Sequence, residues 1–386
     1  MKKETKVLFE LLKNAVFGRE ISEQTKTEAS ENAELLYKMA RHHDLAHLVE
    51  YAFRINGIKA CDETAAYELL KSQALAVMRY EDLNLAISQI SELFEKEKIP
   101  FVPLKGAVIR SFYPEPWMRT SCDVDILVHE DDLDRAEKVL VDRLGYKSKE
   151  TRGYHDVSLY SDTDVHLELH FNIKENRENI DGLLERVWDY ALPKSKGAFE
   201  YILADEFLYF QHIAHMSYHV ADGGCSIRYF MDLLLLDTKL CADKAAVAEM
   251  LRECGLEKFS ETSLKLARIW FSEEEHDEVT PVYEKYLLGG GIYGTKMNAI
   301  AANDNKKSKF SYAVGRIFMP YEKLCITYPN LKGKKYLLPF YQVKRWFRTL
   351  KNRRYLDASK EFEANNSVTI QKANDFSKLF ESLELK

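Results

Sequence analysis

The chain has 386 residues, of which 46% are apolar and 30% are charged, and its formal net charge is −6 at pH 7. These proportions place it among soluble globular proteins, and the length exceeds that of one ordinary domain. No run of about 18 uncharged apolar residues is present, which excludes a membrane-spanning helix. The six cysteines are scattered without a CxxC pair. They indicate reduced, mostly buried thiols in a cytoplasmic protein.

The spacing of apolar residues predicts helices throughout the first hundred residues. The pattern runs over residues 6–17, then over 31–55, and then over 65–98 as one long helix. Pro100 ends the last of these, because proline has no backbone N–H to continue the helical hydrogen bonds. This N-terminal region carries no evident chemistry.

The sequence after Pro100 changes to short apolar runs and turn signals. Alternating residues joined by a polar Ser-Asp-Thr-Asp turn predict a hairpin at the end of this unit. The expected elements, in order, are a strand at 101–104, a short helix at 105–112, a strand at 123–128, a helix at 131–144, and hairpin strands at 155–160 and 165–171. Together they predict a compact α/β module.

Helical spacing returns beyond residue 180, and the expected helices cover 205–220, 227–240, 245–254 and 256–271. We therefore predict an α+β fold, in which a small mixed-sheet core is embedded in a mostly helical protein. The expected domains are an N-terminal helical region (1–99), the α/β core (100–175), a helical domain (176–330), and a basic C-terminal helical region with a tail (331–386).

Basic residues are concentrated toward the C-terminus. Residues 306–354 hold 14 Lys and Arg against one acid, a local charge of +13 that leaves −19 for the rest of the chain. Within it, the segment LLPFYQVKRWFRTLKNRRYL mixes aromatic residues with six bases. Such a segment either binds RNA by stacking and phosphate contacts or forms an amphipathic helix that docks its apolar side on the body. We favour the second interpretation.

Acidic residues gather on two of the predicted strands. In DVDILV, Asp123 and Asp125 share one face because side chains alternate along a strand. In VHLELHF, His166, Glu168 and His170 share a face in the same way. If the two strands lie side by side, Glu168 completes a cluster of three carboxylates. Such a cluster binds hard divalent cations, here Mg²⁺ or Mn²⁺, and is typical of phosphoryl transfer.

The segment LKGAVIRSFYPEPWMRTSCDVDILV with the downstream ELHF resembles the polymerase-β-type nucleotidyltransferase superfamily. More narrowly, it is similar to a bacterial branch labelled uncharacterised nucleotidyltransferase, with its pattern of KGA, Arg, DxD and acid-x-His. The segments HIAHMSYH, IRYFMDLL and RIFMPYEKLCITYPNL extend the resemblance over most of the chain. It implies transfer of a nucleoside monophosphate from an NTP, with ATP the expected donor, to a hydroxyl acceptor. The implied catalytic and metal-binding residues are Asp123, Asp125 and Glu168.

The phosphate end of the expected site departs from the superfamily, because Lys105-Gly106 replaces the usual Gly-Gly or Gly-Ser turn. A glycine at a helix start lets backbone N–H groups approach phosphate oxygens, and a preceding lysine adds a positive charge. The alternative is that Lys105 points to solvent. Arg119 has two open roles, since it either contacts a phosphate or pairs with the carboxylates.

Histidines supply the remaining candidates. His170 either contacts the acceptor, orients Glu168 or simply packs in its strand. His212, His215 and His219 form one stripe of a predicted helix, at i, i+3 and i+7. Because no acid lies on this stripe, we expect it to form a wall of the nucleotide pocket rather than a metal site, with His212 and His215 near the acceptor.

The acceptor itself stays open. An RNA such as a tRNA end would dock on the basic C-terminal region, whereas a small molecule or a protein side chain would not need it. A different class of function is a nucleotide-binding regulatory or interaction protein that keeps the fold without turnover.

Overall fold

The computed structural model describes residues 2–149, 152–289, 333–351 and 370–385, with single positions between 318 and 331. Across these ranges the protein is mostly helical and contains a five-stranded mixed sheet, which confirms the predicted α+β class. No helix in the described ranges has the length and apolar character needed to cross a membrane. The cysteines described are free thiols, but the prediction that most are buried is wrong, since Cys61, Cys122 and Cys241 are exposed. Cys325 lies outside these ranges.

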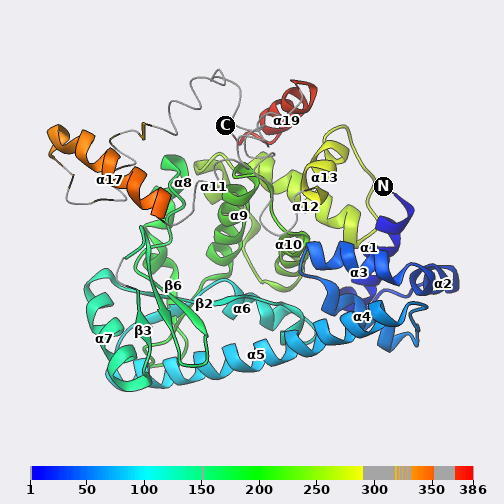
Figure 1. Cartoon of the computed structure of the whole chain (residues 1–386), viewed down its shortest axis with the longest axis horizontal. Helices are drawn as coiled ribbons and strands as arrows, with labels where there is room; N and C mark the ends of the chain where they lie inside the picture. The colour runs from blue at the N-terminus through cyan, green and yellow to red at the C-terminus, as the bar shows by residue number, and fades with distance from the viewer. Residues whose placement is uncertain are drawn as a thin grey trace.

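The N-terminal region is a group of short helices packed on one another and on the later helical body (Figure 1). One prediction is wrong here, because residues 31–55 form two helices rather than one. The chain turns between them at Asp44, whose φ of 57° interrupts the helical backbone. The helices are α1 (Lys3–Phe17), α2 (Glu23–Glu31), α3 (Ala33–His42) and α4 (Ala46–Ile55).

Helix α5 (Glu63–Glu97) extends along one side of the whole molecule (Figure 1). It starts where the Asp62 side chain accepts a hydrogen bond from the backbone of Ala65, as a helix N-cap does. Near its start, Leu69 belongs to the core of the helical part of the protein. Toward its end, Phe94 belongs to a second core beneath the sheet. This helix therefore connects the two packed regions of the molecule.

The sheet has the strand order β1-β2-β5-β4-β3, in which β2 and β5 run parallel and the other neighbours run antiparallel. The predicted strand–helix–strand–helix–hairpin unit is confirmed, and β3 is an additional edge strand. The strands are β1 (Phe101–Pro103), β2 (Asp123–Val128), β3 (Lys147–Ser148), β4 (Asp156–Tyr160) and β5 (His166–His170).

The two faces of the sheet have opposite character. Val124 and Ile126 of β2 are buried together with Leu167 and Leu169 of β5. They pack against α5 and against α7 (Leu133–Leu144), which follows β2 in the chain. Because side chains alternate along each strand, the acidic residues of β2 and β5 are directed to the opposite face. That face meets the helical body.

The helical body surrounds α9 and α10, which pack on each other and on neighbouring helices. Its core includes buried Phe207, Phe210, Phe230 and Trp270. The division of the chain at residues 99, 175 and 330 stays a prediction. The elements after the sheet are α8 (Glu178–Leu184), β6 (Ala191–Pro193), β7 (Tyr201–Leu203), α9 (Asp205–Ala221), α10 (Ile227–Lys239), α11 (Lys244–Glu253), α12 (Glu257–Phe271), α13 (Thr280–Leu288), α17 (Leu338–Lys351) and α19 (Ile370–Ser382).

Candidate active site

The parallel pairing of β2 and β5 brings the predicted acidic residues together. In the register of the two strands, Asp125 lies opposite Glu168, and Asp123 lies opposite His166. His170 lies opposite Leu127, one step further along the same face. The strands are therefore adjacent, as the predicted carboxylate cluster required. Neither β2 nor β5 is at an edge of the sheet, since β1 and β4 flank the pair.

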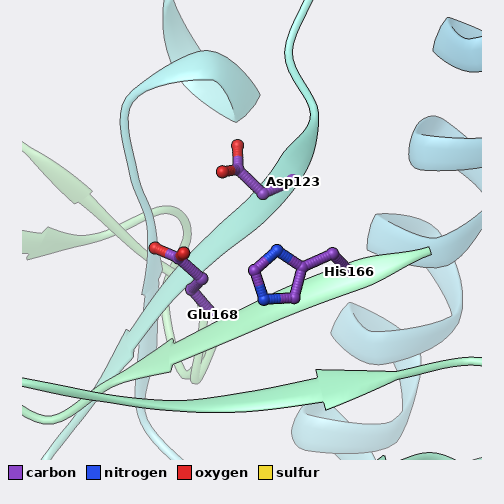
Figure 2. Close-up of side chains that lie close together, drawn as sticks. All are labelled: Asp123, His166 and Glu168. Carbon is purple, nitrogen blue, oxygen red and sulfur yellow. The ribbon is translucent and has the colours of Figure 1, made fainter. Parts of the chain in front are cut away.

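Two groups of ligand atoms on this face are compact enough to hold a metal ion. In the first, Asp123, His166 and Glu168 place their ligand atoms within 4.8 Å of one another. Figure 2 shows these three side chains directed toward a common point above β2 and β5. In the second, Asp125, Glu168 and His170 are equally close. Glu168 belongs to both groups, so it lies between two potential cation positions.

The donor set fits a divalent metal. Carboxylate oxygens suit Mg²⁺ and Mn²⁺, and an imidazole nitrogen beside them suits Mn²⁺ better than Mg²⁺. In addition, the Nε2 atom of His166 is buried and has no hydrogen-bond partner among the described residues. A buried polar atom without a partner is costly, and a metal ligand bond satisfies such a nitrogen.

The carboxylate of Asp125 is held by two donors of this chain. Lys105 Nζ lies 2.8 Å from Asp125 Oδ1, and His170 Nε2 donates to the same oxygen at 2.9 Å. Burial disfavours the charged carboxylate, but these partners outweigh it and hold the pKa of Asp125 well below its ordinary value. Burial also disfavours the Lys105 ammonium, but Asp125 outweighs that cost and raises the pKa of Lys105. Both groups are therefore charged at neutral pH.

The other two acids differ from Asp125 in their surroundings. Burial and the neighbouring charges of Asp125 and Glu168 raise the pKa of Asp123. In contrast, the His170 side chain, 3.5 Å from Glu168, lowers the pKa of Glu168. Asp123 has no ion-pair partner within the described part of the chain. The negative charge of this face is thus neutralised at Asp125 and left unbalanced at Asp123.

The turn that precedes the short helix α6 (Gly106–Ile109) has an unusual backbone. Lys105 has φ 46° and ψ −115°, a combination that glycine adopts easily and other residues rarely do. Next to it, a Cβ atom on Gly106 would lie 2.8 Å from Arg119 Nη1 and 3.1 Å from Ser121 Cβ. The turn therefore combines a glycine-like backbone at Lys105 with a position at Gly106 that leaves no room for a Cβ atom.

Arg119 is fixed by a buried ion pair with the helical body. Its Nη2 atom donates to Asp232 Oδ2 at 2.9 Å, and Tyr113 Oη donates to Asp232 Oδ1 at 2.7 Å. Burial would raise the pKa of Asp232, but Arg119 outweighs it and lowers that pKa. Helical spacing suggests Arg228 as the partner of Asp232, yet Arg228 instead donates to the Thr120 carbonyl at 2.8 Å. The phosphate role of Arg119 stays a prediction.

A cavity of about 290 Å³ lies between the acidic face of the sheet and the helical body. One wall carries the carboxylates with Lys105 and Gly106, and the opposite wall carries side chains of α9 and α10. Its lining thus includes every residue that the sequence proposed for the site. The lining includes Lys105, Gly106, Arg119, Ser121, Asp123, Asp125, His155, Glu168, His170, Lys174, Glu175, His212, His215, His219, Arg228 and Tyr229.

The histidine stripe of α9 is part of the cavity wall. His212 Nε2 donates to the Tyr229 carbonyl at 2.9 Å, and His215 Nδ1 lies 2.7 Å from Glu175 Oε1. His219 Nε2 lies 3.1 Å from His215 Nε2. Burial lowers the pKa of all three histidines, that of His219 to about 3, so they are neutral at pH 7. None of them belongs to a metal-sized group in the described structure.

Two residues of this site were not found from the sequence. Glu175 follows β5 by a few residues, and nothing in the pattern separates it from a surface acid. His155, at the start of the hairpin, stacks on His170 with ring centroids 5.4 Å apart. Both are brought to the cavity by contacts distant in sequence. The spacing of residues along the sequence gives no signal for such contacts.

The fold and the site together resemble those of a nucleotidyltransferase-type protein, with carboxylates on two parallel strands. The model of a family described as "Uncharacterised nucleotidyltransferase" matches residues 29–272. The chain belongs to this family. Comparisons with the curated proteins and with the solved structures gave no match. The matched range covers the sheet, α5 and the helices to α12. It ends before RIFMPYEKLCITYPNL, a segment that the resemblance seen in the sequence had included.

Proposed function

We propose that the protein transfers a nucleoside monophosphate from an NTP, with ATP the expected donor, to a hydroxyl acceptor, and that it requires Mg²⁺ or Mn²⁺. The observation that supports this most directly is the parallel pairing of β2 and β5. It places Asp123, Asp125 and Glu168 on one face of a cavity. Membership of a nucleotidyltransferase family supports the same class of reaction.

In this proposal Asp123, Asp125 and Glu168 hold the divalent cations, with His166 close enough to join them. A bound divalent cation supplies positive charge that neutralises the phosphate oxygens and the leaving pyrophosphate. The backbone around Gly106 and the ammonium of Lys105 bind the phosphate tail. The α9 wall orients the acceptor, through His212 and His215, and helps to exclude water from the cavity.

The reaction is a single displacement at phosphorus. The acceptor oxygen forms a bond to the α-phosphorus, and the bond from that phosphorus to the bridging oxygen of pyrophosphate breaks. Glu168 receives the proton of the acceptor hydroxyl, directly or through water. Because its pKa is lowered by the neighbouring His170, Glu168 is ionised at neutral pH and able to accept that proton.

One observation favours RNA as the acceptor. Near α17, Tyr336 and Phe340 are 77% and 62% exposed, and they lie among Lys334, Lys335 and Lys344. Exposed aromatic rings among cations bind single-stranded nucleic acid by stacking and phosphate contacts. The helix predicted in this region is present as α17, and its docking on the body stays a prediction. The residues of the basic segment beyond 351 lie outside the described ranges.

The proposal is tested by incubating the protein with α-labelled NTPs, Mg²⁺ or Mn²⁺, and a cell extract. We expect label to enter one fraction, either RNA, protein or small molecules, with stoichiometric release of pyrophosphate. RNA labelling that falls steeply with salt and is lost on deleting residues 332–386 identifies RNA as the acceptor. Metal-dependent NTP binding without pyrophosphate release from any fraction would contradict the proposal and identify a regulatory nucleotide-binding protein instead.

A further inference from the structure

The cations around the cavity are all engaged by other groups of the protein. Four cationic side chains line it in the described structure, namely Lys105, Arg119, Lys174 and Arg228. A triphosphate carries several negative charges and needs cationic partners in its site. A triphosphate in this cavity therefore gains a fully free ammonium or guanidinium only if one of these four side chains leaves its present partner.

Three of the four cations have partners that nucleotide binding does not compete for. Arg119 and Asp232 are 6% and 0% exposed in their side chains, and the pair joins two parts of the fold. Arg228 donates through Nη1 to Thr120 and lies 3.5 Å from Asp44, while its Nε atom has no hydrogen-bond partner among the described residues. Lys174 pairs with Glu185, whose side chain is 53% exposed and is not among the residues that line the cavity. None of these partners belongs to a metal-sized group of ligand atoms among the described residues, so a bound metal would not displace these cations.

Lys105 differs because its partner is a predicted metal ligand. Its ammonium lies 2.8 Å from Asp125 Oδ1, an oxygen that also accepts from His170. That oxygen belongs to the group formed by Asp125, Glu168 and His170, which is compact enough for a metal ion. A divalent cation at this position would meet the ammonium of Lys105 at contact distance. Because like charges repel strongly in a buried site, the two cations exclude each other there.

The backbone of Lys105 also indicates that its position is maintained against a cost. A non-glycine residue at φ 46° and ψ −115° is strained, and such strain persists only where the surroundings enforce it. The side chain is 28% exposed, so it retains room to move, whereas the side chain of Asp125 is 5% exposed. The ammonium is therefore the movable member of the pair.

We propose that Lys105 is an exchangeable counter-ion, which neutralises Asp125 in the metal-free protein and transfers to the phosphate tail of the nucleotide when a divalent cation takes its place. This inference rests on the proposed function, because it assumes that the site binds a metal and an NTP. It assigns Lys105 two successive partners. It also makes the binding of metal and nucleotide mutually favourable. The metal releases Lys105 from Asp125 to bind the phosphate tail, and the phosphate tail removes Lys105 from the metal position.

The inference predicts opposite effects of one substitution on two ligands. In Lys105→Met, which keeps most of the length of the side chain and removes its charge, Mn²⁺ should bind about tenfold more tightly in the absence of nucleotide. The affinity for ATP in the presence of Mn²⁺ should fall by about tenfold. Both are measured by titration calorimetry, and free Mn²⁺ by electron paramagnetic resonance. Lys174→Met is the matched control, since it removes a cavity-lining ammonium that has no metal-site partner, and it should leave Mn²⁺ affinity unchanged.

Each other result overturns the inference in a recognisable way. Weaker ATP binding with unchanged Mn²⁺ affinity would make Lys105 a phosphate ligand that does not compete with the metal. Weaker binding of both ligands would make its pair with Asp125 purely structural. Absence of Mn²⁺ and ATP binding by the unmodified protein would overturn the proposed function and this inference with it. If Lys105→Met does not fold, Lys105→Gly serves, because glycine relieves the backbone strain while removing the same charge.

Discussion

Two ion pairs in this protein have similar chemistry and opposite surroundings. The pair of Lys105 and Asp125 lies in the wall of the cavity, with a lysine that is 28% exposed and two further carboxylates beside it. The pair of Arg119 and Asp232 is buried at 6% and 0%, and Tyr113 completes the hydrogen bonds of the carboxylate. The first combines excess negative charge with access to solvent. The second has neither.

The difference shows how a structure separates ions used for binding from ions used for architecture. A buried, fully hydrogen-bonded pair is costly to break, because each partner is left as an unpaired charge without water. A pair at a cavity wall exchanges partners easily, because an entering ligand replaces the charge that leaves. We therefore expect substitutions at Asp125 to change binding and chemistry, and substitutions at Asp232 to change stability.

The largest expected effect is on the reaction. Asp125→Asn removes one charge of the cluster and should reduce nucleotide transfer on the order of 10³-fold, since several kcal/mol of metal-dependent stabilisation are lost. The free energy of unfolding should change by less than about 2 kcal/mol, because the amide oxygen still accepts a hydrogen bond and Lys105 reaches solvent. Label transfer and urea unfolding measure the two quantities. Unchanged transfer in this variant would refute the proposed mechanism.

The reciprocal substitution tests the buried pair. Asp232→Asn leaves Arg119 charged and without a counter-ion, and it should lower the free energy of unfolding by about 3–5 kcal/mol. Asp237→Asn is the matched control on the same helix, because Asp237 pairs with a partly exposed Arg268 at 2.9 Å. The control should cost less than about 1 kcal/mol. Equal losses in the two variants, measured by urea unfolding, would show that burial does not distinguish these pairs.

A smaller effect is expected where the two regions meet. Gly106→Ala places a methyl group 2.8 Å from Arg119 Nη1, so the guanidinium or the turn must shift. We expect a loss of about 1–3 kcal/mol in the free energy of unfolding. Gly182→Ala in α8 is the control, because its Cβ has no neighbour within 4 Å. There alanine should stabilise the helix by about 0.5–1 kcal/mol, and a loss at both sites would point to a general intolerance of alanine.

The smallest effect concerns a buried ionisable group that has no charged partner. Burial, with the nearby His42, lowers the pKa of His43 from 6.5 to about 4. His43 is therefore neutral in the folded protein, while the unfolded chain takes up a proton as the pH falls below 6.5. The contribution of His43 to the free energy of unfolding should be fully present above pH 7, and it should decrease by on the order of 1 kcal/mol by pH 5.

His43→Leu should reduce this acid sensitivity, measured as the difference in unfolding free energy between pH 7 and pH 5. The exposed neighbour His42 provides the control, and His42→Leu should retain most of the difference. If both variants keep the full pH dependence, the protons are taken up elsewhere, with the neutral histidines of α9 as the next candidates.

The parts of the site that were predictable from sequence follow from local periodicity. Alternation along DVDILV and VHLELHF placed Asp125 and Glu168 on matching faces, and their pairing needed only that the strands be neighbours. The stripe of His212, His215 and His219 followed from helical spacing in the same way, and it lies in the cavity wall. Wherever side-chain direction repeats along one strand or helix, the sequence therefore shows which residues share a face.

The parts that were missed depend on contacts between distant segments or on single backbone angles. Asp232 is more than a hundred residues from Arg119, so spacing suggested the nearer Arg228 instead. The break in the predicted helix 31–55 is caused by one residue, Asp44, in a left-handed conformation. Likewise, Lys105 has a backbone conformation that its residue type disfavours. Tertiary contacts impose these features, and the neighbouring residues in the sequence do not predict them.

The Arg119–Asp232 pair has a consequence for any attempt to move the site into another protein. A fragment limited to residues 100–175 would contain all three carboxylates, but Arg119 would lose its partner and the cavity would lose its α9 wall. The matched family range also extends well beyond this fragment at both ends, from residue 29 to residue 272. The smallest portion that could be grafted with a working site is therefore the sheet together with its surrounding helices.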